Sequence, residues 1–266
     1  MIKKIFTLVA ISFQLSVLSQ KKESINYDFS CMEEDETSFF VNLSSDFEKE
    51  ILKTLGGKVS LAEEITLGDT ILAQMQRENK ISKSAIEWDV LNKILFKLTP
   101  HIKKPRGFKY QIYLLGSSEL NAFTVGGKIF FTKGMYKFCK SLDEMACVIG
   151  HEIGHNELGH INENISRIKT ANNFGSIGQM SASIGSLLTT SFNQKNEVHS
   201  DFIGIDLSIA AGYNACSSVV LWQRMKAHEG DYQELYIFFS THPYSGKRSD
   251  CSKQHLRSNY SKVCTQ

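Results

Sequence analysis

Apolar positions return at helical spacing in several segments of this chain. In residues 60–77 and 84–98, leucine, isoleucine and methionine recur every three or four positions, the spacing of one buried helix face. Both runs begin with the Ser-x-x-Glu pattern of a capping box, and Pro100 ends the second run. These segments therefore predict two amphipathic helices, each packed by one face against a core.

Residues 109–115 and 128–132 are rich in aromatic and β-branched residues, which predicts two short strands. Ser141-Leu142-Asp143-Glu144 is a further capping box, and apolar residues follow it at the spacings of a buried helix face. Together these elements predict an α+β fold, mostly helical with a small antiparallel sheet. We expect one domain over residues 45–266, because about 220 residues bury one sizeable core.

The segment His151-Glu152-Ile153-Gly154-His155 lies well inside this third predicted helix. Four residues rotate about 400°, so both imidazoles lie on one face, one turn apart, and can reach one ion. Glu152 lies about 100° from His151, near enough to take a proton from water at the ion and too far round for an ordinary ligand. A chance match is the alternative, but buried His and Glu are costly without a compensating cation. The segment therefore predicts a zinc hydrolase.

A further predicted helix, downstream of the HExxH segment, carries an acid pair four residues apart, Glu197 and Asp201. Glu197 would complete a set of two histidines and one glutamate for one zinc per chain, with an open fourth position. Asp201, one turn on, would accept the free ring N–H of a ligand histidine. Alone, such a pair is usually a solvated helix face. His160, about 140° past His155, is expected to face away, and His199, about 200° from Glu197, to point elsewhere.

These motifs, in their order along the chain, resemble the HtpX-like and CAAX-prenyl-endopeptidase-type zinc metallopeptidases, a gluzincin family with a zincin-like domain. Leu158 and Ile161 stand where a metzincin needs Gly and His, which excludes that class. The resemblance covers about residues 60–250, but the proline that often precedes the family's glycine pair is absent. The matching segments are Asn121-Ala122-Phe123, Gly126-Gly127 with the following strand and turn, HExxH, ExxxD, and Ser240-Thr241-His242-Pro243 with Arg248.

The resemblance also implies roles for residues outside the predicted zinc ligands. His242 would help to stabilise the oxyanion, and Arg248 would order the pocket around Glu197. A plain turn residue before a proline is an equally good interpretation of His242. The strand of Asn121, Ala122 and Phe123 would hold the substrate backbone by β-addition, which favours unfolded or extended segments and limits sequence selectivity.

The first 19 residues have the form of a signal peptide, with Lys3 and Lys4 before an apolar run. That run has about 14 residues, short of the roughly 20 of a spanning helix, so a retained anchor is the weaker alternative. We expect no transmembrane helix in the mature chain; its association with membranes is left open. Residues 20–44 are polar and predict a loosely attached lead-in. Residues 171–192 are too polar to span a membrane and predict a mobile lid or a plain connection.

Removal of residues 1–19 takes away two lysines and no acid, which leaves equal numbers of basic and acidic side chains. This balance gives no indication of a nucleic-acid partner. The even number of cysteines in a chain predicted to be exported indicates some disulfide pairing, and Cys147 is expected to be a free core residue. The six are Cys31, Cys139, Cys147, Cys216, Cys251 and Cys264.

The sequence thus predicts an exported zinc metalloendopeptidase, periplasmic or extracellular, similar to soluble periplasmic assembly-factor proteases. Its predicted substrates are unfolded or misfolded envelope proteins, with Glu152 as the general base. The alternative is a periplasmic chaperone or assembly factor in which proteolysis is secondary, although a pure binding module needs no general base. A hydrolase of prenylated peptides is a third interpretation, but such relatives carry several transmembrane helices.

Overall fold

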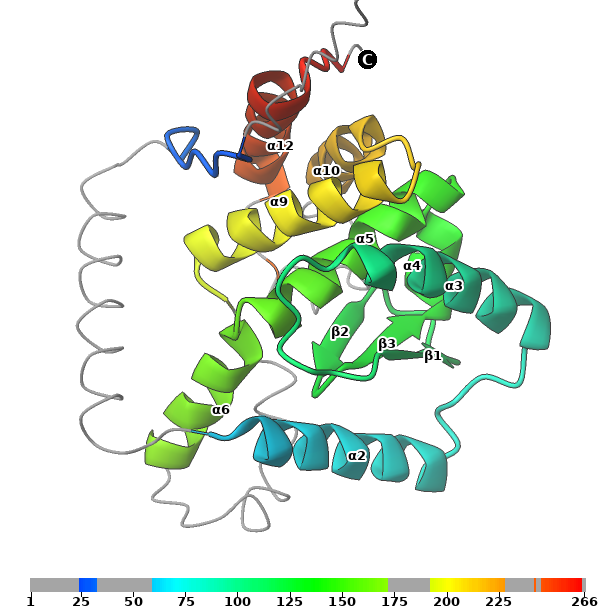
Figure 1. Ribbon diagram of the computed structural model, residues 1–266. Helices are drawn as coiled ribbons and strands as arrows, with labels where there is room; N and C mark the ends of the chain where they lie inside the picture. Colours follow the sequence, from blue (N-terminus) through cyan, green and yellow to red (C-terminus); the bar gives the residue numbers. More distant parts are fainter. Residues whose placement is uncertain (1–23, 33–58, 172–191, 228–241, 243–244, 265–266) are drawn as a thin grey trace, which may run out of the picture.

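The computed structural model of the protein describes residues 24–32, 59–171, 192–227, 242 and 245–264. The predicted signal peptide, the boundary at residue 45 and nearly all of the predicted lid lie outside these residues. The described elements, shown in Figure 1, are α2 (Leu61–Arg77), α3 (Ala85–Leu98), a 3-10 turn (Thr99–His101), β1 (Gln111–Leu115), β2 (Ala122–Val125), β3 (Lys128–Thr132), α4 (Lys133–Phe138), α5 (Leu142–Glu157), α6 (His160–Ala171), α9 (Gln194–Ala210), α10 (Cys216–Ala227) and α12 (Ser245–Tyr260).

The three predicted capping boxes have different outcomes. At α2 the box is complete, because Ser60 accepts from the Glu63 amide and Glu63 accepts from the Ser60 amide. At α5 only the first half forms. Ser141 accepts from the Glu144 amide, whereas the carboxylate of Glu144 binds the Lys140 amide and Arg224. At α3 the predicted box is wrong, since Ser84 is the N-cap residue but its side chain makes no capping hydrogen bond.

The mostly helical α+β fold is confirmed, but the sheet is mixed rather than antiparallel. Its strand order is β1-β3-β2, with β3 antiparallel to β2 and parallel to β1. Gly126 and Gly127, both with positive φ, make the tight turn between β2 and β3 without the family's proline. Because β3 then returns between β2 and β1 instead of beyond β2, it pairs directly with β1, and this pairing is parallel.

The sheet separates two parts of the core. Alternate side chains of each strand point into one part or the other. In β3, Ile129 and Phe131 pack into the cluster that contains residues of α3 and α5, whereas Phe130 packs with α2 and α6. Figure 1 shows α2 across the sheet from α5. The helix that carries the HExxH segment, α5, therefore lies between the sheet and α9, and nearly all its residues are buried.

On its other side α5 packs against α9, and α10 and α12 complete this layer (Figure 1). Two disulfides tie it together. Cys31 is bonded to Cys251 of α12, and Cys216 of α10 is bonded to Cys264. Cys147 is a free buried cysteine, as predicted. Among the described residues, no helix is both long and apolar enough to cross a membrane.

Residues 24–32 belong to the lead-in that we expected to be loosely attached, and for them this expectation is wrong. Besides the disulfide of Cys31, the Tyr27 hydroxyl donates to Asp206 of α9 at 2.9 Å. The Phe29 and Tyr27 rings pack against Phe202 of the same helix. Hydrogen bonds join Asn26 to Asn259 and Asp28 to Gln254, both of α12. The polar composition of the segment hides these anchors.

Candidate metal centre

The two histidines of the HExxH segment lie together on the buried side of α5. Both side chains are almost fully buried, and their Nε2 atoms are 2.9 Å apart. This is the arrangement that an i, i+4 pair on a helix predicts. Two ring nitrogens therefore face the same point from one side.

Helix α9 brings Glu197 to that point because it crosses α5 very closely. The crossing takes place at two glycines, Gly150 of α5 and Gly204 of α9. A Cβ on Gly204 would lie 2.8 Å from the backbone nitrogen of His151. Real Cβ atoms do not approach so closely, so a larger residue would push the helices apart. At this separation Glu197 Oε1 is 3.2 Å from His155 Nε2, and Oε2 is 3.6 Å from His151 Nε2.

The donor set fits a zinc ion. Tetrahedral zinc with bonds of about 2.0–2.2 Å places its ligand atoms roughly 3.3 Å from one another. The two Nε2 atoms are 2.9 Å apart, and each has a carboxylate oxygen of Glu197 at 3.2 or 3.6 Å. His242 adds a fourth possible ligand, since its Nδ1 is 3.2 Å from Glu197 Oε1 and 3.4 Å from His151 Nε2. The four ligand atoms lie within 4.8 Å of one another, all on buried residues. So many converging lone pairs in a buried site favour a bound cation.

The second nitrogen of His151 is bound by Asp201, as the spacing of the acid pair predicts. Nδ1 of His151 is 2.9 Å from Asp201 Oδ1. An ionised carboxylate only accepts, so it favours a hydrogen on Nδ1 and leaves a lone pair on Nε2. Arg248 holds the acid pair from behind, with Nε and Nη2 each 2.7 Å from Asp201 and Nη1 2.7 Å from Glu197.

These contacts give the carboxyl groups different pKa values. Burial alone would raise the pKa of Glu197 and of Asp201, but the charge of Arg248, together with the neighbouring histidines and the hydrogen bonds, outweighs it and holds both pKa values below their usual range. Burial raises the pKa of Glu152, and the neighbouring His242 and His151 only partly oppose it. Burial and the neighbouring His151 lower the pKa of His155 to about 3. Thus Glu197 and His155 are deprotonated, and Glu152 is the more basic carboxylate.

His160 is closer to the site than predicted, and the expectation that it faces away is wrong. Its ring is buried, with Nδ1 3.1 Å from Nδ1 of His155. The rotation of about 140° assumes a continuous helix, but α5 ends at Glu157 and Gly159 has a φ of 79°. The chain turns there and α6 begins with His160, which brings this ring back to the remaining nitrogen of His155. The sequence gives no sign of this turn except the glycine itself.

Asn156 is a further buried residue that the sequence reasoning missed. Its Nδ2 donates to Thr124 of β2 and to the Glu152 carbonyl, and its Oδ1 accepts from the Gly127 amide. It thus joins the HExxH helix to the β2–β3 hairpin. A polar residue directly after the second histidine of the motif is the only signal in the sequence.

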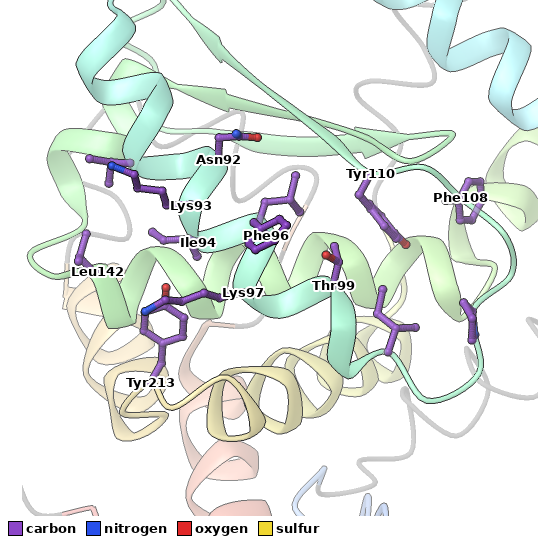
Figure 2. Close-up of a pocket in the computed structure, with 14 residues that line it drawn as sticks. Asn92, Lys93, Ile94, Phe96, Lys97, Thr99, Phe108, Tyr110, Leu142 and Tyr213 are labelled. Atoms are coloured by element: carbon purple, nitrogen blue, oxygen red, sulfur yellow. The ribbon is translucent and has the colours of Figure 1, made fainter.

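The strand predicted to hold substrate is an edge strand, as expected. Ala122 and Phe123 lie in β2, and Asn121 directly precedes it. Ala122 is fully buried, and Phe123 stacks on Phe130 at 4.8 Å between ring centroids. The side-chain oxygen of Asn121 is buried, with no hydrogen-bond partner among the described residues. A separate cavity of about 700 Å³ lies beside α3, around Phe96 and Lys97, and no residue of the metal centre lines it (Figure 2).

Two buried histidines and a glutamate that fit one zinc ion, with a carboxylate next to the first histidine, define the class of HExxH zinc metallopeptidases. The sequence comparison agrees. The family model described as Peptidase family M48 matches residues 90–251, which is more than half of the chain. The protein belongs to this family, and the resemblance predicted from its motifs is confirmed.

Several known proteases are similar to this chain. The mitochondrial metalloendopeptidase OMA1 of Schizosaccharomyces pombe is 33% identical over 152 residues, 53% of this chain and 44% of the relative. The beta-barrel assembly-enhancing protease of Escherichia coli is 24% identical over 194 residues, 64% of this chain and 39% of the relative. The metalloprotease LoiP of Escherichia coli is 28% identical over 167 residues, 57% of this chain and 62% of the relative. The chain spans less than two thirds of each relative's length.

Proposed function

We propose that this protein is an exported zinc metalloendopeptidase that hydrolyses peptide bonds in unfolded or misfolded proteins. The observation that supports this most strongly is the buried cluster of His151, His155 and Glu197, with Glu152 on the same helix as the two histidines. Its ligand atoms have the spacing that tetrahedral zinc needs. A carboxylate of raised pKa beside it supplies a general base.

In the proposed reaction, bound zinc acts as a Lewis acid and lowers the pKa of water in the site to about 7. Glu152 takes a proton from the attacking water and then gives it to the amine that leaves. Its raised pKa suits both steps, because an acid–base group works best with a pKa near the operating pH. Glu197 stays ionised throughout, since Arg248 holds its pKa low.

His242 is proposed to donate to the carbonyl oxygen as it becomes negative. Its Nε2 lies 3.9 Å from Glu152 Oε1, so the ring borders the general base. Burial alone would lower its pKa, but the charge and hydrogen bond of Glu197, together with the charge of Glu152, outweigh burial and raise it, which favours a ring that can donate. Arg248 is proposed to order the pocket, because it binds both Glu197 and Asp201.

The substrate is proposed to lie along the free edge of β2 as an added strand. The position of β2 at the edge of the sheet and its fixation to α5 by Asn156 support this. The unpartnered oxygen of Asn121 could accept a hydrogen bond from the substrate backbone. Backbone recognition selects extended chains and little sequence, which agrees with unfolded proteins as substrates.

An oxidising compartment is proposed from the two disulfides, because such bonds persist outside the reducing cytosol. The name of the Escherichia coli relative, a beta-barrel assembly-enhancing protease, supports substrates of the cell envelope. The competing proposal is a chaperone that uses the same site mainly to bind misfolded envelope proteins. The presence of Glu152 favours the protease, since binding alone needs no general base.

The test is cleavage of casein by the wild-type protein and by Glu152→Gln, with the zinc content measured in both. The variant should keep about one zinc per chain and lose about 10²- to 10⁴-fold in rate, because an amide takes up no proton. Glu157→Gln is the matched control, five residues on in the same helix and outside the metal cluster. Cleavage at the wild-type rate by Glu152→Gln would exclude the mechanism.

The same assay tests His242. His242→Ala should lose about 10²- to 10³-fold in kcat with its zinc retained, the usual effect of removing one oxyanion donor. An increase in rate would instead identify His242 as a fourth ligand that substrate has to displace. The chaperone would be favoured if Glu152→Gln protects casein from aggregation and the wild-type protein does not cleave casein at all.

A further inference from the structure

Arg248 is the one fully buried cation of the described residues that contacts both acids of the ExxxD pair. Its donors are directed at Glu197 and Asp201, which lie at the edge of the guanidinium plane. The face of that plane lies on the ring of Trp222, with 3.5 Å between the guanidinium carbon and the ring centroid. Trp222 comes from α10 and is itself only 3% exposed.

A planar cation can keep one orientation only if both its edge and its face are occupied. The acids fix the edge, but a guanidinium can still rotate about its long side-chain bonds and exchange one carboxylate for the other. An aromatic face at van der Waals distance removes this freedom, and the attraction between cation and ring is strongest for tryptophan and in desolvated sites. The ring of Trp222 also stands edge-on to His151, with centroids 6.1 Å apart.

We propose that Trp222 is a positioning residue of the metal centre, which holds Arg248 in the plane where it bridges Glu197 and Asp201. Through this contact, Trp222 sets the orientation of a zinc ligand and of the acid that binds His151. The zinc affinity of the protein therefore depends on a residue that touches no metal. This inference rests on the zinc site proposed above, but not on proteolysis.

A plain role in packing has to be separated from this one, because Trp222 also belongs to the main hydrophobic core. Phenylalanine keeps an aromatic face, whereas leucine keeps an apolar side chain without one. If Trp222 only fills space, both replacements should affect zinc binding alike. Trp88 is the matched control. It is the other tryptophan of the chain, lies on α3 with 43% of its surface exposed, and is not part of the metal cluster.

The experiment measures zinc affinity of the full mature chain by chelator competition. Trp222→Leu should weaken zinc binding by about 10- to 100-fold, the usual range for residues that orient ligands. Trp222→Phe should weaken it by only about two- to fivefold, since the ring still offers a face. Trp88→Phe should bind as the wild type does.

A double-mutant cycle with Arg248→Lys gives the decisive comparison. Lysine keeps the charge but has no plane to stack, so in this background Trp222→Leu should cost less than about twofold more. An undiminished loss with lysine at 248, or equal losses for leucine and phenylalanine, would overturn the proposal and leave Trp222 a packing residue. If Trp222→Leu does not fold, the cycle is run with Trp222→Phe. The smaller loss of zinc affinity for that replacement must then also disappear with lysine at 248.

The same cycle in urea unfolding of the zinc-free protein separates this proposal from the proposed function. Coupling between Trp222 and Arg248 without metal, together with an absence of zinc binding in the wild type, would refute the zinc site alone. Zinc binding in the wild type without any coupling in either measurement would refute the role of Trp222 alone.

Discussion

The two halves of the metal centre are built in different ways. The histidine half is one turn of one helix, in which His151 and His155 share a face of α5 by their spacing alone. The carboxylate half is an assembly, with Glu197 from α9 and Arg248 from α12, and α12 is tied by a disulfide to residues 24–32. Local sequence thus determines the first half, whereas the second half depends on contacts between segments far apart in the chain.

This difference predicts where the centre is sensitive. A helix between a sheet and a second helix layer keeps its two histidines in place when one neighbour changes. The carboxylate half needs α9 and α12 in register, because Arg248 must reach two acids from another helix. We therefore expect changes far from the metal to weaken zinc binding mainly through the carboxylate half.

The largest expected effect is on stability, from removal of the Cys31–Cys251 disulfide. Replacing both cysteines by serine should lower the free energy of unfolding by about 2–5 kcal/mol in urea titrations. Cys251 packs with Val198 and Phe202, which directly follow Glu197 and Asp201 along α9, so zinc affinity should fall as well.

The second disulfide is the matched comparison. Cys216 and Cys264 are separated by 48 positions, against 220 for the first pair. Chain entropy then predicts a loss about 1 kcal/mol smaller for the second pair. Unchanged urea midpoints for the first double variant would show that this disulfide contributes nothing to the stability of the carboxylate half.

A smaller effect is expected at Asp201, which connects the two halves through His151. Asp201→Asn should still bind zinc and cleave casein, but with affinity lowered by about 10- to 100-fold in a chelator titration. Asp201→Ala should be somewhat worse, because it also leaves Arg248 with fewer acceptors. His199→Ala is the control on the same helix, since its ring packs on Tyr27 and lies outside the metal cluster. Zinc affinity equal to the wild type in Asp201→Ala would show that Asp201 has no role in zinc binding.

Much of the histidine half was predictable because its determinants are local. The capping residue Ser141, the i, i+4 histidines and the bounds of β3 all follow from short patterns. The prediction failed where the chain leaves a regular element. Gly159 ends the rotation that was expected to carry His160 away, and β3 enters between β1 and β2, which no strand pattern reveals.

The carboxylate half was predictable only in part. The spacing of Glu197 and Asp201 indicates their shared face, and the family's motif indicates Arg248. Nothing in the sequence indicates that Trp222 lies under that arginine, because the contact joins α10 to α12. Tertiary packing alone brings the two together.

The most direct test of the two-half centre is the zinc content of Glu197→Ala beside that of His160→Ala. Two histidines alone hold zinc weakly, so Glu197→Ala should purify with almost no zinc and no activity. His160→Ala should keep about one zinc per chain and remain active, because its Nδ1 lies at the nitrogen of His155 that faces away from the metal. Full zinc in Glu197→Ala, with zinc lost from His160→Ala, would place the third ligand on α6 and contradict this account.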